Sequence, residues 1–134
     1  MIVVKRNPVK TSIFGVNHKQ AHMKKNPSVK PVVTIDENEE EYLLYAVVPG
    51  MEKKDLQISS EEGILTIKGV IVTLGRFYRD RCDYSLTEWS RSFHLPLNAD
   101  ILMATAVYQN GELVIHIPKG KEDSNNASLN IYVY

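Results

Sequence analysis

The stretch AVYQNGELVIHIP, residues 106–118, constrains the fold of this chain more than any other feature. Its Asn110-Gly111 pair tolerates positive φ at both central turn positions, and alternating apolar residues flank it, which is the pattern of a tight β-hairpin. Three apolar residues of the second strand point to one side, as in a strand that packs against a core: Leu113, Ile115 and Ile117. The hairpin predicts two paired strands, the second of which lies against a core.

Most other segments from Pro31 onward also predict strands. Short runs rich in apolar and β-branched residues are VVTIDE (32–37), YLLYAVV (42–48), LQISS (56–60), ILTIKG (64–69) and WSRSFHLP (89–96), and MEKKDL (51–56) fits one helical turn. Gly, Pro and Asn turns join them, and no long amphipathic helix lies between them. This organisation predicts an all-β fold, an antiparallel immunoglobulin-like β-sandwich.

The net charge of zero conceals a division of the chain into two oppositely charged parts. Residues 1–31 hold seven basic residues and no acidic one, whereas the remainder has nine basic and 16 acidic residues, a balance of −7. The basic part has few large apolar residues and no sustained period, so we predict a flexible N-terminal arm over residues 1–30. The folded domain is predicted over 31–118, and a C-terminal extension over 119–134.

Several classes of protein do not fit the sequence. No apolar run approaches the roughly 20 residues that span a bilayer, and the N-terminus lacks the apolar centre of a signal peptide. The single Cys82 excludes an intramolecular disulfide framework and fits a reducing, cytoplasmic compartment. No Ser-His-Asp order, phosphate-binding glycine loop or cysteine cluster is present, and His18 and His22 would suit a metal only on a helix. We therefore expect no enzyme, no cofactor and no metal.

Four segments follow one another in a specific order: YLLYAVVPGMEKKDLQI, EEGILTIKG, WSRSFHLPLNADI and AVYQNGELVIHIPK. In this combination the chain resembles the α-crystallin domain of the small heat-shock proteins, of the bacterial and plant type, over about residues 31–118. The resemblance implies an ATP-independent holdase that binds non-native client proteins and assembles as a homo-oligomer of dimers. A monomeric CS-type co-chaperone on the same fold is an alternative, and a structural or adhesive sandwich is another.

The end of the chain, LNIYVY, carries Ile131 and Val133 two residues apart, so both point the same way in a strand. The resemblance implies that this I-x-V motif fills a groove on the sheet of another dimer while its backbone adds a strand. Leu129 forms a second pair with Ile131. The resemblance places the accepting groove at Leu56, Ile58, Ala104 and Ala106. The alternative is a tail that folds back on its own domain.

The segment of residues 70–88 is too long for a tight hairpin turn. It also contains too many aromatic residues for a surface loop without structure or function. The resemblance implies a strand here, which we place near residues 76–82, swapped into a neighbouring subunit to pair with its VVTIDE strand. A mobile surface loop is the alternative. The dimer interface would contain Arg76, Phe77, Tyr78, Val33 and Ile35.

Arg91 lies in an apolar alternation, where a charge needs a partner, and it matches the family's interface arginine. Asp80 and Asp83 are candidate partners, and a guanidinium that snorkels along the sheet rim is the alternative. Arg79 and Arg81 would favour a thiolate at Cys82, although nothing positions a base beside it.

The short basic arm departs from the family, whose N-terminal regions are longer and richer in Phe and Leu. Three interpretations remain open for it: docking onto the acidic segment 36–41, weak binding to nucleic acid or anionic lipid, or a solvated arm. With no overall positive field, we expect neither nucleic acid nor a membrane to be a main partner.

Overall fold

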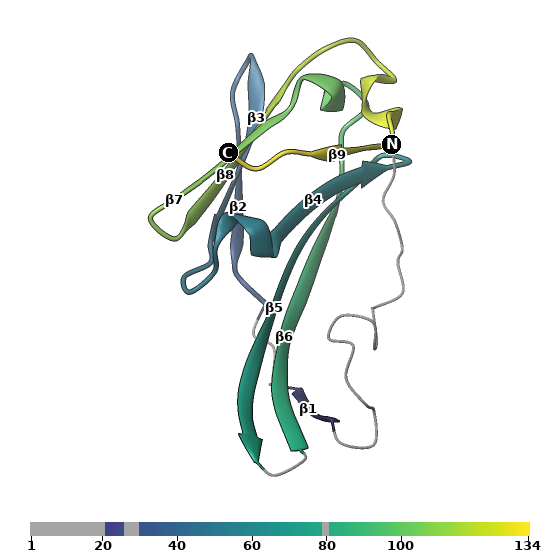
Figure 1. Cartoon of the computed structure of the whole chain (residues 1–134). Helices are drawn as coiled ribbons and strands as arrows, with labels where there is room; N and C mark the ends of the chain where they lie inside the picture. Colours follow the sequence, from purple (N-terminus) through teal and green to yellow (C-terminus); the bar gives the residue numbers. More distant parts are fainter. Residues whose placement is uncertain (1–20, 26–29, 79–80) are drawn as a thin grey trace.

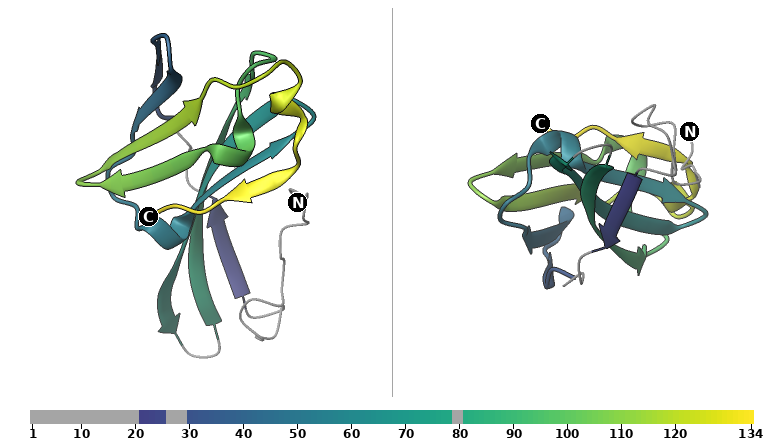
Figure 2. Two further views of the ribbon diagram at one scale, coloured as in Figure 1. Left: turned by 90° about the horizontal axis from the view of Figure 1, so that it is seen from above. Right: turned by 60° about the horizontal axis from the view of Figure 1, so that its bottom comes forward.

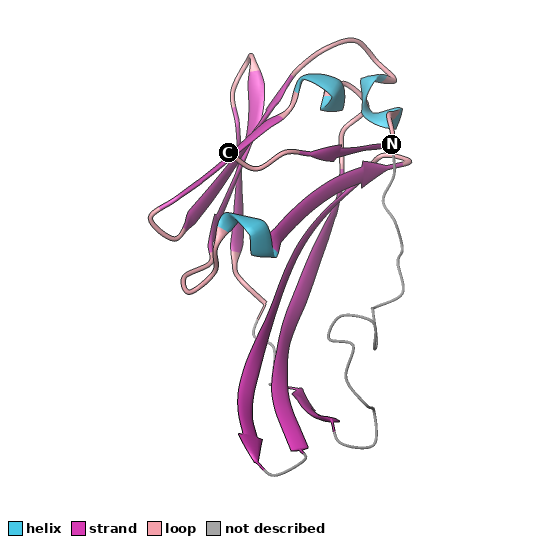
Figure 3. Ribbon diagram, viewed as in Figure 1, coloured by secondary structure: helices cyan, strands magenta, loops and turns pink. Residues whose placement is uncertain are grey.

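Two β-sheets form the folded part of the chain (Figure 1), and the computed structural model describes residues 21–25, 30–78 and 81–134. Sheet A contains, in spatial order, β1 (Ala21–Lys25), β6 (Arg81–His94), β5 (Ile64–Tyr78), β4 (Leu56–Glu61) and β9 (Leu129–Ile131). Sheet B contains β2 (Val33–Glu37), β3 (Glu41–Val47), β8 (Glu112–Pro118) and β7 (Thr105–Gln109). The described helices are three single 3-10 turns at Lys53–Asp55, Ile101–Met103 and Ser124–Asn126 (Figure 3). The predicted all-β sandwich is confirmed.

The hairpin that opened the sequence analysis joins β7 to β8. Gln109 pairs with Glu112, and the two turn residues Asn110 and Gly111 have φ values of 53° and 79°. Positive φ at both positions is the geometry that suits the right-handed twist of the strands on either side. This hairpin is therefore formed as predicted, and β8 also pairs with β3 at the centre of sheet B.

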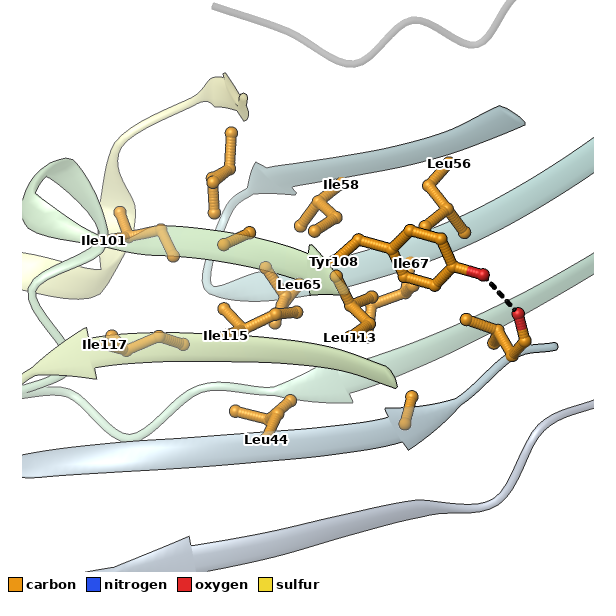
Figure 4. Close-up of a cluster of buried hydrophobic side chains, with 14 of the residues drawn as sticks. Leu44, Leu56, Ile58, Leu65, Ile67, Ile101, Tyr108, Leu113, Ile115 and Ile117 are labelled. Carbon is orange, nitrogen blue, oxygen red and sulfur yellow. Dashed lines mark hydrogen bonds between the residues drawn. The ribbon is translucent and has the colours of Figure 1, made fainter. Parts of the chain in front are cut away.

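The core lies between the two sheets, where alternate residues of the facing strands meet (Figure 4). Its fully buried side chains are Ile58, Leu65, Ile67, Ile101, Leu113, Ile115 and Ile117. Each stabilises the fold by about 1.5–3 kcal/mol relative to an exposed position. The buried Tyr108 hydroxyl donates to the carbonyl oxygens of Val48 at 2.7 Å and Met51 at 2.9 Å, so its polar atom is satisfied.

Strands β5 and β6 form one long hairpin that projects beyond the sandwich (Figures 1 and 2). Pairing runs from Ile64 with His94 to Tyr78 with Arg81, with one register shift between Leu74 and Phe77. The expectation of one strand near residues 76–82 is wrong, because β5 ends at Tyr78 and the antiparallel strand β6 begins at Arg81. Gly69 does not end its strand, and residues 70–78 and 81–88 extend the ladder already begun by ILTIKG and WSRSFH.

A short strand that the sequence did not predict lies within the basic arm. Strand β1 pairs in parallel with β6, from Ala21 beside Cys82 to Lys25 beside Leu86. Its sequence AHMKK lacks an apolar alternation, and the described side chains of Met23, Lys24 and Lys25 are exposed. Backbone pairing to an open edge needs no apolar face, so the pattern search had no signal to find. The rest of the predicted arm, residues 1–20 and 26–29, lies outside the described residues.

Candidate functional site: the groove between β4 and β7

The C-terminal segment lies across the place where the edge of sheet A meets the edge of sheet B. Strand β9 pairs antiparallel with β4, with Ile131 opposite Ile58 and Leu129 opposite Ser60. Two residues further on, Val133 forms a parallel bridge with Ala106 of β7. The segment therefore joins both sheets, and in Figure 1 it crosses from the label β9 toward the C-terminus beside β7 and β8.

Backbone hydrogen bonds hold the last residue of this segment on β7. The Tyr134 amide donates to the carbonyl oxygen of Ala106 at 3.0 Å, and the Tyr108 amide donates to the Tyr134 carbonyl oxygen at 2.8 Å. These bonds satisfy edge groups of β7 that would otherwise face solvent. Strand addition of this kind supplies affinity through the main chain and leaves selection to the side chains.

The side chains of the segment alternate as the sequence predicts for a strand. Ile131 is buried with the core, and Leu129 and Val133 are partly buried against it. Tyr132 and Tyr134 point away and are exposed, with their ring centroids 4.7 Å apart. The apolar pair of the I-x-V motif thus enters the groove while the two tyrosines remain on the solvent side.

Each residue predicted to line the groove is found beside it or in the adjoining core. Ile58 and Ala106 pair directly with the segment, Leu56 lines an adjoining cavity of about 500 Å³, and Ala104 is partly buried against the core. Lys53 and Lys54 border the same cavity. The occupant of the groove is this chain's own tail, which is the fold-back alternative of the sequence analysis.

The linker before the tail is anchored, which its polar sequence GKEDSNNAS did not indicate. Asn125 is buried, and its Nδ2 donates to the Leu95 carbonyl oxygen at 3.0 Å. The Gly120 amide donates to the Asn98 carbonyl oxygen at 2.7 Å, and Asp123 turns the chain with φ of 73°. A residue of Asp or Asn type tolerates this left-handed conformation, so the run of Asp and Asn was the available signal. The anchored linker starts the tail close to its own groove.

Arg91 has a backbone partner in the structure. Its Nη1 donates to the Pro31 carbonyl oxygen at 2.7 Å, and its guanidinium lies 5.2 Å from the centroid of the Phe93 ring. Asp83 lies eight residues away on the same strand, about 26 Å at 3.3 Å per residue, so it is not the partner within one chain. Asp80 lies outside the described residues.

The residues predicted for the dimer interface fall on two separate elements. Val33 and Ile35 lie on β2, an edge strand of sheet B, where Val33 is partly buried and Ile35 is 52% exposed. Arg76, Phe77 and Tyr78 end β5, and the structure describes their backbone alone. One chain does not bring these two sets together, and their contact across a dimer stays a prediction.

Among the described residues, no three His, Cys, Asp or Glu side chains gather closely enough to hold a metal ion. Over residues 21–25, 30–78 and 81–134 no helix has the length and hydropathy that a bilayer crossing requires.

Comparison with known proteins gives a consistent result. The model of the Hsp20/alpha crystallin family matches residues 34–133. The chain is 34% identical to small heat shock protein C4 of Rickettsia felis over 111 residues, which cover 79% of this chain and 66% of that protein, just under two thirds of its length. It is 35% identical over 94 residues to a probable 15 kDa heat shock protein of Leptospira interrogans, covering 68% of this chain and 71% of that protein. A crystal structure of a small heat-shock protein from Xylella fastidiosa superimposes with a TM-score of 0.56 at 33% identity, covering 69% of this chain and 88% of that one.

Proposed function

Because this chain belongs to the Hsp20/alpha crystallin family, we propose that it is an ATP-independent molecular chaperone, a holdase that binds unfolding proteins and prevents their aggregation. The members it resembles are small heat shock proteins, which are chaperones and not enzymes. A partner that captures non-native chains keeps them from aggregating by mass action and needs no energy source. Consistent with this role, we propose a cytoplasmic protein that acts without a cofactor.

The observation that carries this proposal is the groove between β4 and β7, which holds an extended apolar segment by strand addition. Ile131 is buried there, on a three-residue strand that pairs with β4, and the residues after it pair with β7. An unfolding protein exposes many segments with apolar residues two apart, and such a segment would make the same contacts. The client competes with the tail for the groove.

We propose that assembly uses the same contacts between chains. The I-x-V motif of one dimer would occupy the groove of another, and the distal part of the β5–β6 hairpin would pair with the open edge of a neighbour's β2, near Arg91. Support comes from the exposed Ile35 on that edge and from the length of the hairpin. The Xylella fastidiosa relative is described as having a distinct high order structure.

One observation favours the monomeric CS-type module as a second candidate. The tail fills the groove of its own chain, and β1 pairs with part of the edge of β6, so two of the edges in sheet A are occupied without a second subunit. A protein whose edges are filled in this way has less need to assemble.

The test compares the intact chain with two tail variants, each of which carries two substitutions to serine. Ile131→Ser with Val133→Ser removes the side chains that enter the groove, whereas Tyr132→Ser with Tyr134→Ser changes the two exposed side chains, of which Tyr132 also lines the rim of the adjoining cavity. Size exclusion with light scattering measures assembly, and turbidity of a heat-labile enzyme without ATP measures client protection. We expect the first pair to reduce a larger assembly to dimers and the second pair to leave it.

Three results would contradict parts of the proposal. Client turbidity that does not fall with the intact chain would refute the holdase. A monomer for every variant, together with client binding, would favour the CS-type module. Equal assembly of both tail variants would show that the I-x-V motif does not link dimers.

A further inference from the structure

The strands of sheet B share an unusual charge pattern. The four strands β2, β3, β7 and β8 contain no lysine and no arginine, but they contain four carboxylates: Asp36, Glu37, Glu41 and Glu112. The turn between β2 and β3 adds Glu39 and Glu40, which are both exposed. The strands of sheet B therefore carry only acidic charges, which attract positively charged groups.

The outward face of the same sheet carries a band of apolar side chains. Val114 of β8 pairs with Tyr45 on one side and with Val107 on the other, so three apolar residues lie in one row. Leu43 and Val47 lie two residues to either side of Tyr45 on β3 and point the same way. Val47 is 63% exposed and Val107 41%. The inward neighbours of these residues form the core, so the band is a second apolar surface of the sheet, which the described residues leave at least partly exposed.

Carboxylates lie at both ends of this band. Asp36 pairs with Leu43 and Glu112 pairs with Val47, so each acid adjoins the apolar side chains. Among the described residues no ion pair involves either acid. Glu41 and Glu37 differ, because Glu41 contacts His116 at 3.0 Å and Glu37 accepts a hydrogen bond from Lys119 at 2.6 Å. That bond raises the pKa of the Lys119 ammonium above its ordinary value. The carboxylate of Glu37 is therefore already paired with a cation of the folded domain.

The N-terminal segment of the chain has the complementary composition. Residues 1–6, MIVVKR, place three consecutive β-branched residues beside two cations, and the first 31 residues carry no acid. The 14 residues between this segment and β1 extend to about 46 Å at roughly 3.3 Å per residue, which is long enough to cross a small domain. A surface that is apolar with acidic ends matches a segment that is apolar with a basic end.

We propose that residues 1–6 dock on the outward face of sheet B, over the band of Leu43, Tyr45, Val47, Val107 and Val114. Ile2 and Val4 cover the apolar row, and Lys5 and Arg6 approach Asp36 or Glu112. Two of the other exposed apolar regions are less favourable for a basic segment, because Lys53 and Lys54 border the β4–β7 groove and Lys24 and Lys25 lie beside the distal hairpin. The proposal concerns the arm and is independent of chaperone activity.

Photo-cross-linking on the full chain tests this placement. Benzoylphenylalanine replaces Val4, which the proposal places on the docking side, the sample is irradiated at low salt, and mass spectrometry maps the linked peptides. We expect the links to concentrate on residues 43–47, 107 and 114, within one chain or between two. Asp36→Asn with Glu112→Gln should lower the yield about fivefold, since each lost charge pair weakens docking modestly.

A matched control distinguishes the specific effect of this surface from the general effect of removing two negative charges. Glu61→Gln with Glu122→Gln also removes two exposed carboxylates, but both lie outside sheet B, and the yield should stay unchanged. Adding about 0.5 M salt should weaken the links of the intact chain, because the Debye length then falls below about 5 Å. Links concentrated on the β4–β7 groove or on the distal hairpin, a diffuse pattern, or equal losses in both double variants would overturn the proposal.

Discussion

The two halves of the β5–β6 hairpin share one ladder but lie in different environments. In the proximal half, Leu65 and Ile67 are almost wholly buried, and Trp89 on the opposite strand is 6% exposed. On the same face of the distal half, Ile71 is only partly buried and Thr73 is exposed, and on the opposite face Leu74 is 51% exposed. The sequence is rich in β-branched and aromatic residues in both halves, so the difference comes from what faces them.

What faces the proximal half is sheet B. Leu65 and Ile67 meet residues of β8 in the core, whereas the distal half extends past the end of the second layer (Figures 1 and 2). Its described contacts are with the partner strand of the hairpin and with β1. Backbone pairing alone gives a marginally stable hairpin in water, so the stability of the domain resides in the proximal half.

The same substitution in each half gives the largest contrast. Leu65→Ala leaves a cavity in the core and should lower the free energy of unfolding by about 2–5 kcal/mol. Leu74→Ala removes an exposed side chain and should change it by less than about 0.5 kcal/mol. Urea denaturation followed by the fluorescence of Trp89, the single tryptophan of the chain, measures both. If both variants lost the same free energy of unfolding, Leu74 would be buried in solution, as it would be at a subunit interface.

Gly69 marks the boundary between the two halves and gives a smaller effect. A Cβ at this position would lie 2.5 Å from Cε2 of Trp89 and 2.7 Å from the Met51 methyl group. The Met51 chain can move, but the buried indole cannot, so we expect Gly69→Ala to lower the free energy of unfolding by about 1–3 kcal/mol.

Gly75→Ala is the distal counterpart of that change. Its Cβ would lie 2.8 Å from the carbonyl oxygen of Asp83, so the two strands must separate locally. Because little of the core depends on that region, global unfolding by urea should change less than for Gly69→Ala. Hydrogen exchange should show faster opening of amides near Gly75. A greater global loss for Gly75→Ala would contradict the division of the hairpin into a stabilising and a dependent half.

The sequence predicted the parts of the molecule in which one face is buried. Alternation located β8 through Leu113, Ile115 and Ile117, and the Asn110-Gly111 pair located its turn, because burial of one face requires a period of two. The same rule identified Ile131 and Val133 as an inward pair. It could not decide which chain's groove they enter, since the side-chain contacts are identical within one chain and between two.

Elements held mainly by backbone contacts were missed for the same physical reason. The described side chains of strand β1, those of residues 23–25, are exposed, and the linker is fixed by Asn125 and by hydrogen bonds to backbone carbonyl groups. The distal hairpin carries no signal that distinguishes it from a separate strand, because residues 70–88 are too many for a tight turn. The length of a segment between two strands does not show whether it is a loop, because the paired strands can continue beyond the sandwich into solvent.

The smallest predicted effect concerns β4, the strand that pairs with the proximal half of the hairpin. Ser60 of β4 is fully buried opposite Leu65, and its Oγ has no hydrogen-bond partner among the described residues. A buried hydroxyl without a partner loses its hydration and gains nothing in return, so Ser60→Ala should leave stability unchanged or raise it by up to about 1 kcal/mol.

Ser92→Ala is the matched control, because the Ser92 hydroxyl lies 3.1 Å from that of Thr66 on the exposed side of the same hairpin, and its loss should be slightly destabilising. A loss above about 1 kcal/mol for Ser60→Ala would show that the Ser60 hydroxyl is satisfied in solution. Since Ser60 also lies opposite Leu129, the partner would then be sought in the tail, and the hydroxyl would belong to the groove rather than to the core.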